Sequence, residues 1–166
     1  MIYSEEIINK VKDILVKNEE TIAAAESVTS GHLQAAFSVG MEASKYFQGG
    51  ITTYNLGQKA RHLKIDPILG MKVNCVAQKI ANKMAVEVSR MFSSDYGIGI
   101  TGYASIVPEC EEEGIFAFFS LSYNQKVMIS ERITSSADHP HKVQVDYCNQ
   151  VIEKVYKYLS LENKES

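Results

Sequence analysis

The sequence is poor in cysteine and offers no cysteine pair that suggests a bridge or a metal site. Its three cysteines, Cys75, Cys110 and Cys148, lie far apart and show no Cys-x-x-Cys or Cys/His spacing, so we expect free thiols in a reducing compartment. Cys75 and Cys148 fall in apolar helical patterns, where a thiol is usually buried as a small hydrophobic side chain. Cys110 lies among glutamates, whose negative charge is expected to raise its pKa and lower its reactivity.

Long apolar runs and clusters of basic residues are also missing. No stretch approaches the roughly 18 apolar residues of a membrane span, and the first residues do not form a basic segment followed by an apolar run. The formal net charge is -3 and the lysines are scattered, which argues against binding to nucleic acid or to a membrane. The sequence therefore predicts a cytoplasmic protein with a small-molecule partner.

The length of 166 residues suits one domain, and no low-complexity tract or linker divides the chain. With 45% hydrophobic residues, the chain can bury a core without disulfides or metal. We expect one domain over residues 1–161 and a polar, frayed tail over residues 162–166.

Periodicity and local composition predict alternating strands and helices. Short runs of apolar, β-branched or aromatic residues predict strands over residues 21–25, 49–54, 96–102, 115–123 and 126–134. Capping residues and apolar positions three or four apart predict helices over residues 4–15, 30–37, 55–62, 74–91 and 143–159. The order predicts an α/β fold, a three-layer α/β/α sandwich with a mostly parallel sheet and an antiparallel edge hairpin.

Several local features refine these elements. Asn74 is the expected cap of the long central helix, and Gly40 is expected to end the second helix in a left-handed conformation. Asn124-Gln125 predicts a tight turn between the last two strands. Gly49-Gly50 indicates a bulge or a close backbone approach at the start of the second strand.

Hydroxyl and small residues gather where the first predicted strand meets the second helix. Glu26, Ser27, Thr29, Ser30 and Gly31 occupy this junction. In open α/β sheets, ligands bind at the carboxyl ends of strands, where side-chain oxygens and the N–H groups of a helix start are available. Simple helix capping by Ser and Thr is the alternative. We place the candidate active site at this junction.

Three segments stand out in order along the chain. They are residues 25–31 (Ala-Glu-Ser-Val-Thr-Ser-Gly), residues 47–55 with Lys59 five positions after Tyr54, and residues 99–102 (Gly-Ile-Thr-Gly). Together they resemble the carboxyl-terminal domain of the CinA family of competence and damage-inducible proteins, over nearly the whole chain. Many members are nicotinamide mononucleotide deamidases. The family also includes longer proteins with an additional amino-terminal domain, and this chain resembles a stand-alone version.

The resemblance implies an activity and a set of site residues. The activity is hydrolysis of the amide of nicotinamide mononucleotide to nicotinic acid mononucleotide and ammonia, without a metal or a cofactor. Ser27 falls on the nucleophile position and Lys59 on the base, with Tyr54 beside it. The implied substrate-binding positions are Glu26, Thr29, Ser30, Gly31, Gly50, Thr101 and Gly102.

The chemistry explains these residue types. A serine hydroxyl is a weak nucleophile until a base takes its proton, and a lysine is such a base only if burial or a nearby cation lowers its pKa. Backbone N–H groups of residues 29–31 are candidates for holding an oxyanion or a phosphate.

The chain departs from the family pattern around the expected phosphate site. Ser30 replaces a glycine, which costs about 1 kcal/mol if the backbone there has positive φ. Residues 103–109 replace a glycine-rich loop, and residues 109–113 include four glutamates. Those charges either belong to a solvated surface loop or bind metal, and near the site they would repel a phosphate.

A second departure lies before the last helix. Residues 138–141, Asp-His-Pro-His, stand where relatives carry an arginine in a Gly-Asp-Arg-like turn. His139 or His141 is therefore either a weaker phosphate partner or an ordinary exposed histidine. His32 and His62 have no evident chemical partner in the sequence and are expected to be structural.

Two hypotheses follow. The first is an amidohydrolase acting on nicotinamide mononucleotide or a related pyridine or purine nucleotide. The second is a catalytically impaired binding or assembly module that keeps the fold but has lost the glycine-rich phosphate site. In both cases the resemblance and an apolar hairpin face suggest a homo-oligomer.

Overall fold

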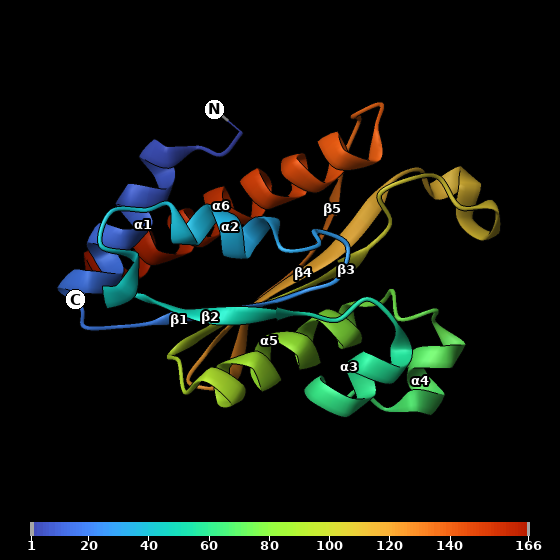
Figure 1. Cartoon of the computed structure of the whole chain (residues 1–166), viewed down its shortest axis with the longest axis horizontal. Coiled ribbons are helices and arrows are strands. Elements are labelled where there is room, and N and C mark those ends of the chain that lie inside the picture. Colours follow the sequence, from blue (N-terminus) through green and yellow to red (C-terminus); the bar gives the residue numbers. More distant parts are fainter. Residues whose placement is uncertain (1, 166) are drawn as a thin grey trace.

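The computed structural model describes residues 2–165 and has a five-stranded sheet at its centre (Figure 1). The strands lie in the order β2-β1-β3-β4-β5. Their bounds are β1 Ile22–Glu26, β2 Phe47–Thr52, β3 Tyr96–Gly102, β4 Phe116–Tyr123 and β5 Lys126–Thr134. β1 pairs in parallel with β2 and β3, whereas β4 pairs antiparallel with β3 and β5. Four strands thus share one direction and β4 opposes it, which confirms the predicted sheet.

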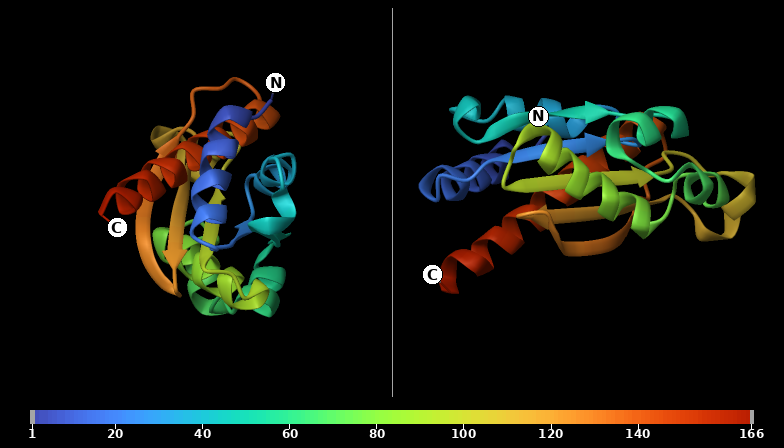
Figure 2. Two further views of the ribbon diagram at one scale, coloured as in Figure 1. Left: turned by 90° about the vertical axis from the view of Figure 1, so that its left-hand side faces the viewer. Right: turned by 90° about the horizontal axis from the view of Figure 1, so that it is seen from below.

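Helices cover both faces of the sheet (Figures 1 and 2). One face carries α1 Glu5–Lys17, α2 His32–Ser38 and α6 Pro140–Glu165, and the other carries α3 Leu56–Leu63, α4 Pro67–Lys72 and α5 Gln78–Phe92. Two 3-10 helices complete the chain, η1 Ala43–Lys45 and η2 Pro108–Glu113. The three-layer α/β/α arrangement is confirmed. None of the helices described over residues 2–165 is both long and apolar enough to cross a membrane.

The last helix extends into the segment for which a frayed tail is predicted. α6 continues to Glu165, so residues 162–165 are helical. The predicted fraying of residues 162–166 stays a prediction, and Ser166 lies outside the described residues.

Each face of the sheet has its own apolar core, and β1 contributes to both. Ala24 joins the core under α1, α2 and α6, whereas Ala23 and Ala25 join the core under α3 and α5. Successive side chains of a strand point to opposite faces, and all five residues of β1 are buried. β1 is therefore a central strand, and its small residues let helices approach closely from both sides.

Glycines bring the central helix directly onto β3. A Cβ at Gly97 would lie 2.0 Å from the carbonyl oxygen of Ala85, and a Cβ at Gly99 would lie 2.2 Å from that of Ala81. No side chain fits at either distance, so the strand of alternating glycine and isoleucine packs directly against α5. The contact fixes α5 against the strand that ends in Thr101-Gly102.

The two glycines of β2 show both predicted features. Gly49 has φ +125°, and the pairing register shifts between Ile22 and Ala23, which marks a bulge. A Cβ at Gly50 would lie 2.4 Å from the carbonyl oxygen of Ala24, so the backbone of β1 approaches closely there.

The hairpin turn also agrees with its prediction. Asn124 and Gln125 have φ values of 47° and 63°, and Tyr123 pairs with Lys126. Two consecutive positive φ values suit a two-residue hairpin, because this turn matches the twist of the paired strands.

Three local predictions were wrong. The central helix begins at Gln78 and not at Asn74, because Asn74 and Cys75 form a left-handed turn with φ values of 49° and 57°. Cys75 is therefore buried in a turn and not on a helix. Gly40 does not have positive φ. A glycine is required at this position for a steric reason, because a Cβ there would lie 2.3 Å from the Tyr46 hydroxyl. The short helix α4, capped by the Asp66 side chain, was not predicted.

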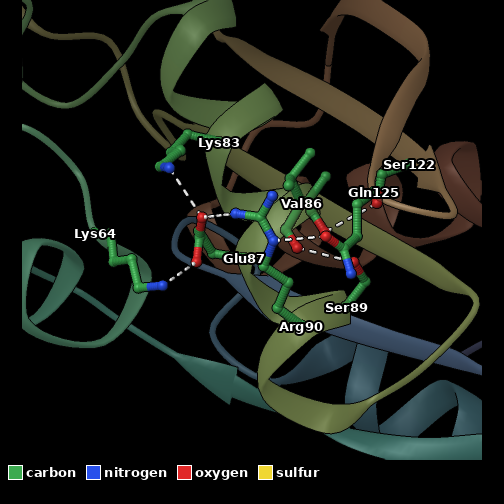
Figure 3. A network of polar contacts seen from close by, with 9 residues as sticks. Lys64, Lys83, Val86, Glu87, Ser89, Arg90, Ser122 and Gln125 are labelled. Atoms are coloured by element: carbon green, nitrogen blue, oxygen red, sulfur yellow. Dashed lines mark hydrogen bonds and ion pairs between the residues drawn. The ribbon is translucent and has the colours of Figure 1, made fainter.

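A buried carboxylate ties α3 to α5 (Figure 3). Glu87 on α5 is 3% exposed and binds Lys83, Arg90 and Lys64 at 2.8, 2.6 and 3.2 Å. Lys64 is the C-cap residue that directly follows α3. Burial raises the pKa of Glu87, but hydrogen bonds from Lys83 and Lys64 outweigh it, so the pKa is lowered overall. Of these ion pairs, the one with Lys64 joins the end of α3, the helix that carries Lys59, to α5.

Replacing Gly99 tests the contact between β3 and α5. Gly99→Ala should lower the free energy of unfolding by about 2 to 3 kcal/mol, because the added methyl group forces α5 away from the sheet. Gly57→Ala, inside α3 where only Asn55 Oδ1 lies within 4 Å at 3.4 Å, is the matched control and should be neutral or stabilising. Urea denaturation measures both. Equal stabilities of the two variants would contradict the packing described.

Candidate functional site

A cavity of about 780 Å³ opens where β1 and β3 end. Its lining includes five of the residues that the sequence predicts for the site: Ser27, Tyr54, Lys59, Thr101 and Gly102. The remaining lining residues come mainly from α3, α4, the turn before α5, the segment after β3 and the start of α6: Val28, Asn55, Leu56, Gly70, Met71, Asn74, Cys75, Val76, Tyr103, Ala104, Ser105, Val107, Pro140 and Gln144. The cavity occupies the usual ligand position of an open α/β sheet.

Ser27 and Lys59 meet in this cavity, although 32 positions separate them in the sequence. The distance between Lys59 Nζ and Ser27 Oγ is 2.8 Å. Ser27 directly follows β1, and its backbone N–H donates to the Ile100 carbonyl of β3. Lys59 lies one turn into α3, whose start is fixed because the Asn55 side chain accepts a hydrogen bond from the Gln58 N–H. The sheet and α3 therefore position the two groups independently.

The Lys59 amine is buried, and none of the described carboxylates pairs with it. Its side chain is 1% exposed, and besides Ser27 it contacts the carbonyl oxygens of Thr53 and Tyr54 at 2.9 and 3.2 Å. Burial lowers the pKa of Lys59, and the Cys75 thiol opposes that shift only in part. A neutral amine has two hydrogens for the two carbonyls and a lone pair for the Ser27 hydroxyl. The surroundings thus suit a lysine that acts as a base.

Tyr54 contributes to the site from the strand-to-helix connection. Its carbonyl oxygen holds Lys59, while the residue as a whole is 77% exposed and lines the cavity. Tyr54 therefore lies at the mouth of the cavity.

Glu26 lies outside the cavity, which the sequence alone did not indicate. It is fully buried and does not line the cavity. Its carboxylate accepts hydrogen bonds from the Thr29 hydroxyl, from the N–H groups of Gly31, Leu33 and Gln34, and from the Gln34 amide, at 2.6 to 3.1 Å. Glu26 thus serves as the cap of α2, because it satisfies N–H groups that a helix start leaves unpaired.

The other residues of the junction lie around this cap. Thr29 is buried, and Ser30 and Gly31 have positive φ values of 52° and 101°. Thr29, Ser30, Gly31 and Gly50 are absent from the cavity lining. The positive φ of Ser30 meets the condition under which a serine in place of glycine costs stability. The substrate-binding roles of these residues stay a prediction.

A hydrogen bond from a side chain of β3 fixes one wall of the cavity. The Thr101 hydroxyl donates to the Cys75 carbonyl oxygen at 2.7 Å. It thereby fixes the left-handed turn of Asn74 and Cys75 beside Lys59. Met71, Val76 and Gln144 also line the cavity, and no sequence pattern marked them.

The segment after β3 turns its small and apolar residues toward the cavity. Ala104, Ser105 and Val107 line it, whereas the glutamates of η2 are exposed and do not. Within residues 2–165, no group of three or more His, Cys, Asp or Glu side chains is arranged to hold a metal ion. Burial, with the charges of Glu113 and Glu109, raises the pKa of the Cys110 thiol.

The histidines lie outside the cavity. His139 and His141 are exposed and face each other, with their Nδ1 atoms 3.2 Å apart, and neither lines the cavity. Their role as phosphate partners stays a prediction. His32 and His62 do have partners, the Tyr3 hydroxyl at 2.7 Å and the Gln58 side chain at 3.0 Å.

Comparison with known proteins identifies the family of the chain. The family model described as "CinA C-terminal domain" matches residues 4–159. The chain belongs to the CinA C-terminal domain family. A CinA-like protein of Prochlorococcus marinus is 41% identical over 91 residues, which cover 55% of the chain and 22% of that protein. A putative competence-damage inducible protein of Streptococcus equi subsp. zooepidemicus is 35% identical over 115 residues, 69% of the chain and 27% of that protein. The CinA-like chain thus matches about a quarter of the length of these relatives.

Solved structures share the fold of this CinA family member. The competence damage-inducible protein A (ComA) of Klebsiella pneumoniae superposes with a TM-score of 0.86 at 19% identity, covering 95% of this chain and 98% of that one. The CinA superfamily protein of Enterobacter cloacae gives a TM-score of 0.84 at 22% identity, covering 96% and 94%. At these identities the likeness shows the fold alone.

Glu26→Gln tests the cap of α2. The substitution keeps the size of the side chain but turns an amide toward N–H donors that need an acceptor, so we expect a loss of about 2 to 3 kcal/mol of unfolding free energy. Glu153→Gln, at an exposed position of α6, should change it by less than about 0.5 kcal/mol. Denaturation by urea compares the two, and an equally small effect at position 26 would show that the carboxylate does not hold the helix.

Lys59→Met tests whether the buried amine titrates abnormally. Its folded-state pKa is lowered from 10.5, so between that lowered pKa and 10.5 the unfolded chain binds more protons than the folded one. The stability of the wild type should therefore rise with pH across this window relative to Lys59→Met. Lys79→Met, at an exposed position of α5, should show no such trend. A pH-independent difference between wild type and Lys59→Met would contradict the lowered pKa.

Proposed function

We propose that the chain is a Ser/Lys amidohydrolase with Ser27 as the nucleophile and Lys59 as the base. The observation that carries the proposal is the 2.8 Å contact between Lys59 Nζ and Ser27 Oγ on the floor of the cavity. A buried lysine without a carboxylate partner has no evident structural purpose, because burying an unpaired charge is costly. Perturbed titratable groups in a cavity are typical of catalytic sites.

The proposed reaction has two stages. Ser27 Oγ attacks the carbonyl carbon of the amide and its proton passes to Lys59 Nζ, which then protonates the departing nitrogen as the C–N bond breaks. Ammonia leaves and an acyl-serine ester remains. Lys59 next takes a proton from a water molecule that attacks the ester, and returns it to Ser27 Oγ as the acid is released.

Backbone N–H groups near Ser27 are available to stabilise the oxyanion. The Ser30 N–H donates to the Ser27 carbonyl, and the Gly31 N–H to Glu26, so two of the three expected donors are engaged. The N–H of Val28 has no hydrogen-bond partner among the described residues, and Val28 lines the cavity. We assign Val28 as the candidate oxyanion donor.

The substrate that the family resemblance implies is nicotinamide mononucleotide, which would give nicotinic acid mononucleotide and ammonia. It is the first compound to assay because its primary amide is the bond that the dyad is suited to attack. Membership of the CinA C-terminal domain family supports this choice.

A non-catalytic binding or assembly module is the second candidate. The segment after β3 favours it, because the cavity is lined there by Tyr103, Ala104 and Val107, where active relatives are expected to carry a glycine-rich loop. Val127 and Met128 on the edge strand β5 are 40% and 45% exposed. A homo-oligomer that uses this edge is part of the second proposal.

Ammonia release from nicotinamide mononucleotide separates the two candidates. The amidohydrolase predicts a measurable rate for the wild type and a loss of at least about a thousandfold in kcat for Ser27→Ala and Lys59→Met. Ser38→Ala and Lys79→Met, both at exposed positions outside the cavity, should keep the wild-type rate. Unchanged turnover in Ser27→Ala would rule out the proposed mechanism. Absence of release from the wild type, together with absence of a thermal shift on adding the nucleotide, would favour the module.

A further inference from the structure

A second cavity, of about 550 Å³, lies at the opposite end of the sheet from the cavity that holds Ser27 and Lys59. It opens where the turn before β1, the start of β3, the end of β4 and the last turns of α6 come together. Figure 1 shows the end of α6 at the same end of the sheet as the start of β1, with α3 and α4 at the other end. Among the described residues, none lines both cavities.

Three tyrosine rings line this second cavity. Tyr96 and Tyr123 pair across the antiparallel strands β3 and β4, and their ring centroids are 4.6 Å apart with the planes inclined by 30°. Tyr158 joins them from α6. Tyr96 is 4% exposed, whereas the other two residues are partly buried. The face of an aromatic ring carries partial negative charge and attracts cations, organic ammonium ions among them.

Two carboxylates, those of Glu20 and Glu162, line the second cavity as well. The Tyr123 hydroxyl donates to Glu20 at 2.8 Å, and the Asn18 amide donates to the same carboxylate at 3.4 Å. Both donors are neutral, and no lysine or arginine of the described residues forms an ion pair with either glutamate. The hydrogen bond to Glu20, together with burial, raises the pKa of Tyr123. No described cation therefore compensates the negative charge of the two carboxylates.

The rest of the lining contains apolar groups, and no basic side chain of the described residues belongs to it. Leu159 is buried, and Met128, 45% exposed, extends the apolar surface to the mouth. Lys17, Lys126 and Lys157, which are close to the cavity in the sequence, are exposed and do not line it. A wall of ring faces, aliphatic groups and carboxylates disfavours anions. It favours a cation with an apolar surface, because such an ion gains from the rings as well as from the carboxylates.

We propose that the second cavity binds an alkylammonium ion, with the ammonium group against the tyrosine rings and beside the carboxylates of Glu20 and Glu162. The volume of about 550 Å³ is in the range of small-molecule sites and leaves room for an alkyl chain. A free amine and the side chain of a lysine on another protein present the same group to this wall. The site does not involve Ser27 or Lys59, so it is independent of the proposed reaction.

Two matched pairs of compounds test the proposal at neutral pH and constant ionic strength. Choline and 3,3-dimethylbutan-1-ol have the same shape, but only choline is charged, and this pair represents a free small cation. Nα-acetyl-lysine methylamide and Nα-acetyl-norleucine methylamide differ by the ammonium group, and this pair represents the side chain of a partner protein. NMR of the full chain with labelled tyrosine rings measures each dissociation constant, and Tyr123→Phe and Tyr158→Phe assign the two resonances to follow.

We expect at least one of the two cations to bind at least about tenfold more tightly than its neutral counterpart. A tenfold difference is about 1.4 kcal/mol, which is within the range of a cation held over aromatic rings. Tighter binding of choline would identify a free small cation, and tighter binding of the lysine derivative would identify a protein side chain. Equal affinities within both pairs, or absence of binding by all four compounds, would overturn the proposal and leave the amidohydrolase standing.

Substitutions in the wall locate the binding. Glu20→Gln removes a charge but keeps an oxygen acceptor, and should weaken binding of the preferred cation at least about fivefold. Glu19→Gln removes the neighbouring charge at an exposed position outside the lining and should leave the dissociation constant unchanged. Tyr158→Leu and Tyr156→Leu, both at partly buried positions of α6 of which only the first lines the cavity, make the same comparison for a ring. Glu162→Gln, at an exposed position, replaces Glu20→Gln if that variant does not fold. Equal constants within each comparison would contradict the site.

Discussion

The structure around the candidate site depends on one buried amine. Lys59 Nζ lies among three oxygen atoms, those of Ser27, Thr53 and Tyr54, and no carboxylate of the described residues pairs with it. Such an environment favours the neutral amine, and a neutral amine beside a serine hydroxyl is a base. Burial of the amine without a paired charge therefore both lowers the stability of the fold and makes the lysine a base.

Separate parts of the fold hold the two members of the dyad. Ser27 follows a strand buried on both faces, and Glu26 just before it fixes the start of α2 with its carboxylate. Lys59 lies on α3, which the ion pair between Lys64 and Glu87 joins to α5. Gly99 lets α5 lie directly on β3. The helix that α3 contacts and the strand that Ser27 follows therefore both pack against β3. A rigid frame of this kind keeps a reactive pair at hydrogen-bonding distance.

Much of the fold could be predicted from the sequence, since the strands and most helices follow from periodicity, and the tight turn from Asn124-Gln125. The pairing of Ser27 with Lys59 came from the family resemblance. The left-handed turn at Asn74 and Cys75 could not be predicted, because a bond from Thr101 holds it from another strand. Likewise, the five hydrogen bonds of Glu26 depend on how the chain turns back after β1. Contacts between distant segments carry no local signal.

The most direct measurement is the titration of Lys59 itself, followed by NMR of selectively labelled lysine side chains. The account predicts that one resonance, absent in Lys59→Met, titrates with a midpoint below that of the remaining lysines. It also predicts that binding of an acyl group at Ser27 changes that midpoint, because the contact with the free hydroxyl is lost. A Lys59 resonance that titrates together with the surface lysines would show that the amine is charged at neutral pH and would contradict its role as the base.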